Sequence, residues 1–313
     1  MPEMMSTRTG YGKGMMRLAQ EHSDVIVTSA DTYRSFALGD FVTAYPDRYY
    51  EFGIAEQNMI SASAGMASEG YKVFCVGYSP FLSMRALEQI RTFAAYTNLN
   101  VKIVSGLSGL AGDSDGVTHQ GTEDIGIVRT IPNMHLLCPA DAVAASAFVD
   151  FCYDIEGPVY LRLGRGATPV IYEESQKFEY GKSIIYRDYG NDAVIIATGP
   201  CVYEAGVAAD ILHKDASVNV TVIDMHTIKP LDTATIDSYC KKTTSVFTVE
   251  DGSIYGGLGG AVAEHLIENG ICPERFKRMG LTTFGTAGTL PELFAFFGID
   301  GKSIAGKVLD TIK

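Results

Sequence analysis

Basic residues are in short supply in this sequence. It contains 25 lysines and arginines against 37 aspartates and glutamates, which gives a net charge of −12. Nucleic-acid binding needs a basic face, so this balance argues against it while leaving room for a local basic pocket. No apolar run is long enough to span a bilayer, and the start "MPEMMSTRTGYGKGMM" lacks the apolar core of a signal peptide. We therefore expect a cytoplasmic protein with no membrane association.

Cysteines are also few, and they are scattered. No two are spaced as a CxxC pair, which argues against a zinc site, and several lie in apolar or helical runs. This pattern predicts buried, reduced thiols and no metal ligands in this chain. The six are Cys75, Cys138, Cys152, Cys201, Cys240 and Cys272.

What the sequence does have is an alternation of short apolar runs with helical patterns. At 313 residues it is long for one core, so two domains are expected. In the first series, strands are predicted at 24–31, 71–77, 100–106, 134–140 and 158–164, and helices at 55–70, 80–96 and 141–154. The helix at 80–96 is predicted to be amphipathic, with an apolar face formed by Leu82, Ala86, Ile90 and Phe93. In the second, strands are predicted at 192–199, 218–225 and 245–251, and helices at 201–214, 232–241 and 259–270.

The stretch between the two series, 165–182, has the mixed charge and the proline and glycine content of a linker. The predicted strands are continuous apolar runs, which suit parallel sheets covered on both faces. We therefore predict an α/β protein of two three-layer α/β/α domains with mostly parallel sheets. Their expected limits are 1–175 and 183–313.

An acidic residue, Glu56, interrupts an apolar region in "EFGIAEQNMI". One interpretation is electrostatic, because a carboxylate in the first turn of a helix meets free backbone amides and the positive dipole end. The other is a buried carboxyl whose pKa is raised by desolvation, so that it holds a proton and donates a hydrogen bond to a ring nitrogen. The residue taken alone favours the first interpretation.

Two polar segments follow predicted strands, where open α/β sheets keep their ligands. In "GDSDGVTHQG", Asp115 and His119 would contact hydroxyls or transfer protons, unless the segment is a solvated turn. In "LRLGRGATP", Arg162 and Arg165 would bind a phosphate or sulfonate, unless they form a salt bridge at the domain boundary. The first pair of alternatives is evenly balanced, and the second slightly favours the salt bridge.

Two further features each have an ordinary and a functional interpretation. Phe81, beside Pro80 at the start of a predicted helix, is either a core residue or a ring that faces a flat heterocycle. The glycine-rich "YGGLGGAVAEH" at 255–265 invites a nucleotide interpretation, but Val262 stands where the third glycine of that motif belongs. Tight packing between a strand and a helix explains these glycines better.

Together these residues resemble the C-terminal half of a transketolase. Four motifs carry the resemblance, in the order and spacing of that family: "FGIAEQNM", "FLSMRALEQIR" after Gly77, "DGVTHQG" and "LLCPAD". The resemblance covers nearly the whole chain and matches the split type, in which a transketolase is two polypeptides. It implies a pyrimidine-binding domain followed by the transketolase C-terminal domain.

The resemblance implies thiamine diphosphate chemistry, with roles for the residues singled out above. Glu56 corresponds to the carboxyl that hydrogen-bonds N1′ of the aminopyrimidine, and Phe81 to the aromatic residue that packs on that ring. Asp115 and His119 correspond to residues that contact the donor sugar near the reacting carbons. Arg165, with Arg162 near it, corresponds to the arginine that binds the terminal phosphate of the substrate.

The sequence departs from the family pattern in two places. Leu107 stands about twelve residues before His119, where many transketolases have a histidine, which suggests a variant ketose with a different anionic tail. The "GDG" motif that binds the diphosphate and a divalent metal in the family does not occur. We therefore expect a partner polypeptide to bind the diphosphate and Mg²⁺ or Ca²⁺, in a heterotetramer with two copies of each chain.

The leading hypothesis is a transketolase subunit that transfers a two-carbon ketol unit from an anionic ketose to an aldose phosphate. A 2-oxo acid dehydrogenase β subunit is disfavoured by "DGVTHQG", whereas a deoxyxylulose-phosphate synthase fragment shares a similar loop. A catalytically silent assembly module is the alternative from another class. A dinucleotide oxidoreductase, suggested by the glycines near 256–260, ranks last.

Overall fold

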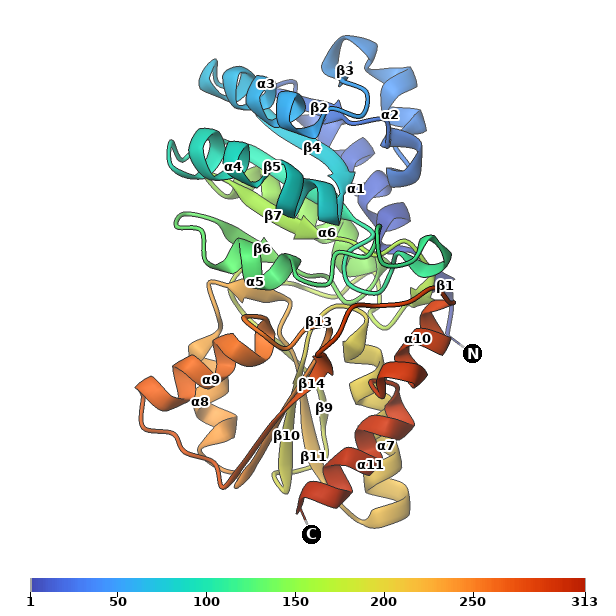
Figure 1. Ribbon diagram of the computed structural model, residues 1–313, viewed down its shortest axis with the longest axis vertical. Helices are drawn as coiled ribbons and strands as arrows, with labels where there is room; N and C mark the ends of the chain where they lie inside the picture. Colours follow the sequence, from blue (N-terminus) through green and yellow to red (C-terminus); the bar gives the residue numbers. More distant parts are fainter. Residues whose placement is uncertain (1, 313) are drawn as a thin grey trace.

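The computed structural model describes residues 2–312 as two stacked α/β units (Figure 1). The first unit contains a seven-stranded sheet in the order β12-β6-β7-β5-β4-β2-β3, in which only β12 is antiparallel to its neighbour. The strands are β2 (Val25–Ser29), β3 (Tyr49–Glu51), β4 (Lys72–Tyr78), β5 (Val101–Gly106), β6 (His135–Leu137), β7 (Val159–Arg162) and β12 (Thr227–Lys229).

Helices cover both faces of this first sheet because its central strands are apolar on both sides. Alternate residues of β2 divide between two cores: Val25 and Val27 pack with α1 (Thr7–Glu21) and α6 (Ala142–Asp154). Ile26 packs on the opposite side with α3 (Glu56–Ser68) and α5 (Asp124–Arg129). The smaller helix α2 (Gly39–Ala44) packs against α1. The alternation is the two-residue period of a strand buried on both faces.

The second unit repeats this plan with five strands in the order β14-β13-β10-β11-β9, of which β9 is antiparallel to its neighbour. Helices α8 and α9 pack on one face, and α7, α10 and α11 on the other. The predicted fold class is therefore confirmed. The elements are β9 (Ile184–Asp188), β10 (Ala193–Ala197), α7 (Cys201–Ala216), β11 (Val220–Asp224), α8 (Thr233–Cys240), β13 (Ser245–Ser253), α9 (Leu258–Glu268), β14 (Arg275–Leu281), α10 (Leu290–Phe297) and α11 (Gly301–Ile312).

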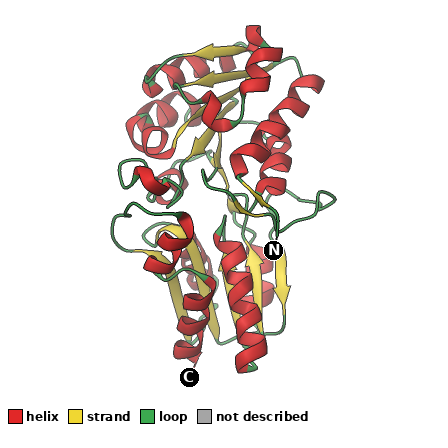
Figure 2. Cartoon of the chain, turned by 90° about the vertical axis from the view of Figure 1, so that its right-hand side faces the viewer, coloured by secondary structure: helices red, strands yellow, loops and turns green. Residues whose placement is uncertain are grey.

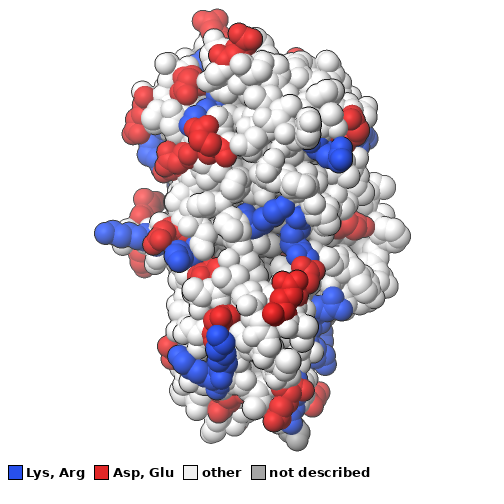
Figure 3. Space-filling view, turned by 90° about the vertical axis from the view of Figure 1, so that its left-hand side faces the viewer, with Lys and Arg blue, Asp and Glu red and all other residues white. Residues whose placement is uncertain are grey.

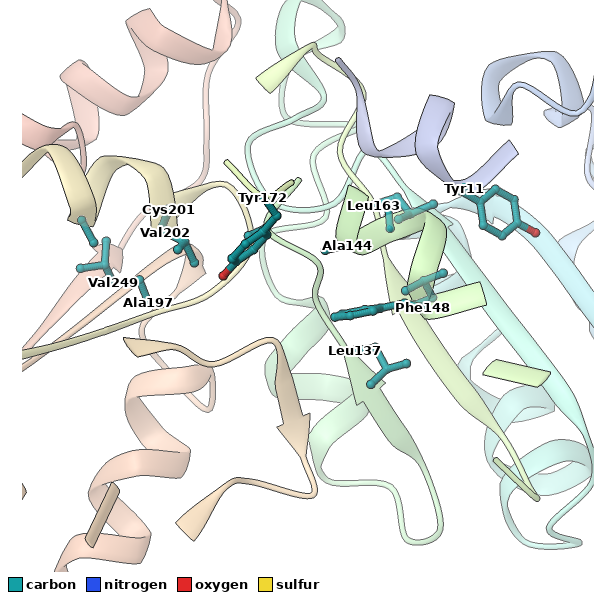
Figure 4. Packing of buried hydrophobic residues seen from close by; sticks show 14 of the residues in the cluster. Tyr11, Leu137, Ala144, Phe148, Leu163, Tyr172, Ala197, Cys201, Val202 and Val249 are labelled. Atoms are coloured by element: carbon teal, nitrogen blue, oxygen red, sulfur yellow. The ribbon is translucent and has the colours of Figure 1, made fainter. Parts of the chain in front are cut away.

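The two units share a core as well as a boundary. One hydrophobic cluster runs from Leu137 and Phe148 of the first unit through Tyr172 to Val202 and Val249 of the second (Figure 4). Strand β12, although it follows β11 in the chain, pairs with β6 and so completes the first sheet. A two-stranded ribbon of β1 (Met4–Met5) and β8 (Thr168–Pro169) lies near the same junction. The arrangement of the two units is thus fixed by packing and by backbone pairing.

Ion pairs join the surfaces of the units too. Arg129 of α5 binds both carboxylate oxygens of Glu264 of α9, at 2.6 and 2.7 Å, and also donates to the carbonyl oxygen of Gly256. Bidentate pairs of this kind have the best geometry available to an arginine and a carboxylate. Acidic and basic side chains lie next to one another on the face shown in Figure 3.

The helical stretch predicted at 80–96 is wound differently from an ordinary α-helix. Residues 81–85 and 90–95 form π-helical turns on either side of the short helix α4 (Leu87–Gln89). Leu82, Ala86 and Ile90 are buried as predicted, but Phe93 is 42% exposed and Ala94 takes its place in the core. The apolar stripe therefore repeats every four residues, as the wider π turn requires, and the prediction for Phe93 was wrong.

Five of the six cysteine thiols are buried, as predicted, and Cys272 is exposed. Burial raises the pKa of the Cys75 and Cys138 thiols to about 11, and that of Cys152 to about 12. These groups are therefore protonated and unreactive at neutral pH. In the part of the chain that the structure describes, no helix combines the length and apolar character needed to cross a membrane.

A buried acid at the end of β11 makes the fold sensitive to pH. Burial raises the pKa of Asp224 to about 8, while the Tyr172 hydroxyl donates to its Oδ2 at 2.7 Å. Because the pKa in the folded state lies above that in the unfolded state, this acid stabilises the fold fully below about pH 4, and the contribution is lost as the pH rises through about 8.

We predict that the free energy of unfolding of Asp224→Asn increases relative to that of the wild type as the pH rises from about 4 to about 8. Urea unfolding at each pH measures this, and parallel profiles would contradict it.

Candidate active site

The predicted site residues come from elements that end at one edge of the first sheet. Strands β4, β5 and β7 are parallel, so the segments after Tyr78, Gly106 and Arg162 all leave the sheet at its carboxyl edge. Figure 2 shows loops gathered at mid-height of the molecule, between the two units. Open α/β sheets bind their ligands outside the carboxyl ends of the strands, which is this edge.

Glu56 is the first residue of α3 and only 3% exposed, which matches both the helix-start position of the first interpretation and the burial of the second. Arg85 donates to its Oε2 at 2.8 Å and supplies the opposite charge that a buried carboxylate needs. The guanidinium of Arg85 also lies over the ring of Phe81, 4.2 Å from its centre. Arg85 was not among the predicted site residues, although its position four residues after Phe81 in one helical stretch was a signal for it.

Phe81 and His119 lie together, as the site hypothesis requires. Their ring centres are 5.4 Å apart with the rings nearly perpendicular, and Tyr78 lies about equally near both, at 6.0 and 6.3 Å. Such edge-to-face contacts favour a fixed ring orientation. His119 Nδ1 and the Thr118 hydroxyl are 3.0 Å apart. Two of the predicted side chains thus share one aromatic cluster at the end of β4.

Asp115 and Arg165 form an ion pair at the same edge, with both side chains more than a third exposed. Arg8, from the first turn of α1, donates to the carbonyl oxygen of Arg165 at 3.2 Å. Burial and the nearby charge of Arg165 lower the pKa of Arg8, and burial raises the pKa of Asp113. Two arginines therefore lie close together beside acidic residues. Arg8 was not among the predicted site residues, because it lies far from the others along the chain.

Arg162 lies apart from these residues, at the junction between the units. Its side chain is 2% exposed; Nε contacts both oxygens of Asp124 at 3.0 and 3.1 Å, and Nη1 donates to Asp251 at 2.6 Å. Asp124 belongs to the first unit and Asp251 to β13 of the second. Of the two interpretations of this arginine, the structure therefore favours the salt bridge at the domain boundary.

The second unit holds the loop that carries Asp115 and His119. Gln120 Nε2 donates to the carbonyl oxygen of Thr286 at 2.8 Å, and Ser253 N donates to that of Thr122 at 2.7 Å. A Cβ on Gly285 would lie 2.0 Å from the Gln120 carboxamide oxygen, so the two segments are in close contact. The loop is anchored near its end by two backbone groups of the second unit.

Leu107, the position of the missing histidine, begins this loop. It is 1% exposed and has a φ of 57°, in the left-handed region that costs a residue with a Cβ on the order of 1 kcal/mol. Gly121 N donates to its carbonyl oxygen at 3.2 Å, which closes the loop on itself. Backbone strain of this kind persists only where the surrounding structure enforces it.

The glycine-rich segment at 255–265 contains the start of α9, and a protein carboxylate occupies the anion position there. Glu250 accepts hydrogen bonds from the backbone of Leu258 and Gly259, both at 2.9 Å, and burial raises its pKa to about 7. A Cβ on Gly257 would lie 1.9 Å from Glu250. These contacts support the packing interpretation of the glycines. Within residues 2–312, the structure contains no group of three or more His, Cys, Asp or Glu side chains that could hold a metal ion.

Comparison with known proteins identifies both units. Residues 3–170 match the family model "Transketolase, pyrimidine binding domain", and residues 181–304 match "Transketolase, C-terminal domain". A putative transketolase C-terminal section of Methanocaldococcus jannaschii is 41% identical over 98% of this chain and 96% of that protein. A subunit of the apulose-4-phosphate transketolase of Phocaeicola vulgatus is 36% identical over 99% and 98%. A solved structure, described as a split gene transketolase and inactive β4 tetramer, superposes with a TM-score of 0.88 at 33% identity and covers 98% of both chains.

Proposed function

The chain belongs to the transketolase family, and on that premise we propose that it is the part of a split, thiamine diphosphate-dependent transketolase that binds the aminopyrimidine. In this proposal the enzyme transfers a two-carbon ketol unit from an anionic ketose, such as a ketose phosphate, to an aldose phosphate. The observation that carries the proposal is the grouping of Glu56, Phe81 and His119 at one sheet edge.

The residues at this edge fit the ring of the implied cofactor. A buried carboxyl at a helix start and a nearby aromatic ring are the two groups that a planar, hydrogen-bonding heterocycle needs. Arg85 supports this fit, because its planar guanidinium already contacts both Glu56 and Phe81. When bound, thiamine diphosphate would supply the electron sink for breaking a carbon–carbon bond.

The chain's own residues then have distinct tasks. The carboxyl group of Glu56 would form a hydrogen bond with the ring nitrogen N1′. Phe81 would pack on the ring and exclude water from it. Asp115 and His119 would bind donor hydroxyls near the reacting carbons and hold or move protons there. Arg165 with Arg8 would bind the anionic tail, since paired guanidiniums suit phosphate oxygens.

We also propose that activity requires a second polypeptide, which binds the diphosphate and the Mg²⁺ or Ca²⁺ ion in an α2β2 heterotetramer. Two observations support this. Two relatives that match this chain nearly from end to end are named as parts of a transketolase, one as a C-terminal section and one as a subunit. The similar solved assembly, made of β chains alone, is described as inactive.

We predict that the chain purified alone binds thiamine diphosphate weakly and transfers no ketol units, even with magnesium present. Adding a companion polypeptide that carries the "GDG" motif is expected to restore both. Calorimetric titration of the cofactor and a coupled assay with ketose and aldose phosphates measure the two properties. Full activity of the isolated chain would refute the partner requirement, and activity only with pyruvate and glyceraldehyde phosphate would favour a deoxyxylulose-phosphate synthase.

A further inference from the structure

Arg85 contacts both Glu56 and Phe81: it donates a hydrogen bond to the carboxylate and lies over the aromatic ring. We propose that Arg85 is a positioning residue for Glu56: it holds one carboxylate oxygen so that the other faces the cofactor ring. This inference rests on the function proposed above.

The hydrogen bonding of Glu56 supports different roles for its two carboxylate oxygens. Arg85 Nη1 donates to Oε2 at 2.8 Å, whereas no described residue donates a hydrogen bond to Oε1. Carboxylates prefer several donors when they are removed from water, and Glu56 is 3% exposed. Oε1 of Glu56 is therefore free to form a hydrogen bond with a bound molecule.

The backbone around Arg85 explains why it reaches this position. Residues 81–85 form a π turn closed by the hydrogen bond from Ala86 N to the carbonyl oxygen of Phe81, at 3.0 Å. This winding brings Arg85 over the Phe81 ring, where the cation and the ring face attract one another. π turns of this kind occur frequently at functional sites.

The contact with Phe81 restricts the guanidinium in turn. Stacked on the ring at 4.2 Å, it has less freedom than a surface arginine, although its side chain is 44% exposed. A carboxylate held by a restrained guanidinium loses little further entropy when a ligand binds, which is the benefit of preorganisation. Arg85 thus links the orientation of Glu56 to that of Phe81.

The test uses the complex reconstituted with its partner polypeptide and compares Arg85→Met with Arg85→Lys. Because a hydrogen bond to a charged group is worth about 1.5–3 kcal/mol, Arg85→Met is expected to weaken thiamine diphosphate binding by about 10- to 100-fold. Arg85→Lys keeps the charge and is expected to restore most of the affinity. Calorimetric titration gives the affinity, and hydrogen–deuterium exchange at C2 of the bound cofactor reports the orientation of Glu56.

Arg91→Met is the matched control, because Arg91 is an exposed arginine in the same helical stretch. It is expected to leave both readouts unchanged. Unchanged or tighter binding by Arg85→Met would overturn the inference, since the guanidinium would then only occupy the place of the ring. Arg85→Gln gives a second uncharged variant if Arg85→Met assembles poorly. Failure of the wild-type complex to bind the cofactor would instead refute the proposed function.

Discussion

Replacing Glu56 by glutamine is expected to lower the rate of ketol transfer by the reconstituted enzyme about 10²–10⁴-fold, the range of a lost acid–base group. Glutamine keeps the size of the side chain but cannot exchange a proton with N1′. The same variant should abolish hydrogen–deuterium exchange at C2 of the bound cofactor. Steady-state assays and NMR of the exchanging proton measure the two effects.

The control for this experiment is Glu88→Gln. Glu88 is a nearby acid in α4 that accepts a hydrogen bond from the side chain of the neighbouring Gln89. It is expected to keep both activities. Should Glu56→Gln retain normal C2 exchange, the carboxyl takes no part in activation and the silent assembly module becomes the better hypothesis.

Replacing Arg162 by methionine is expected to lower the free energy of unfolding by about 3–5 kcal/mol, the usual cost of removing one partner of a buried ion pair. The substitution leaves Asp124 and Asp251 as buried carboxylates without their cation. Chemical unfolding followed by circular dichroism measures the loss. The substrate KM of the surviving folded enzyme should stay close to that of the wild type.

Arg165→Met is the matched comparison, because Arg165 is 40% exposed and pairs with an exposed acid. Exposed pairs contribute about 0–1 kcal/mol, so its stability should change little. Its KM for an anionic ketose should rise instead. Normal stability together with a raised KM for Arg162→Met would contradict this prediction and would indicate that Arg162 binds the substrate.

Sequence alone predicts the strands and helices of the central layers because their apolar runs are long and unambiguous. It gives no strand at β14, whose "RFKRMGL" lies at the edge of its sheet with Lys277 and Arg278 exposed. Edge strands often carry charged side chains that discourage pairing with another chain, and such charges interrupt the apolar pattern. The first helix, α1, is missed for a related reason: its sequence "TRTGYGKGMMRLAQE" is rich in glycine and polar residues.

The site could be predicted where function depends on local motifs, and it could not where function depends on contacts distant in sequence. Glu56, Phe81 and His119 stand in motifs that carry the family resemblance. Arg8 reaches Arg165 across 157 positions of the chain, and no spacing rule indicates such a contact. The role of Arg162 depends in the same way on Asp251, 89 positions away.

The late strand β12 limits how this protein can be taken apart. A fragment that stops near residue 175 retains every helix of the first unit but lacks Thr227–Lys229, the strand that lies against β6. The edge of β6 would then have unpaired backbone groups that can pair with a strand of a neighbouring molecule. Pairing of this kind is a common route to aggregation. Cutting the chain at the linker therefore breaks the first sheet, and cutting it beyond Lys229 would instead part β9, β10 and β11 from β13 and β14 of the second sheet, so no single cut separates the two units intact.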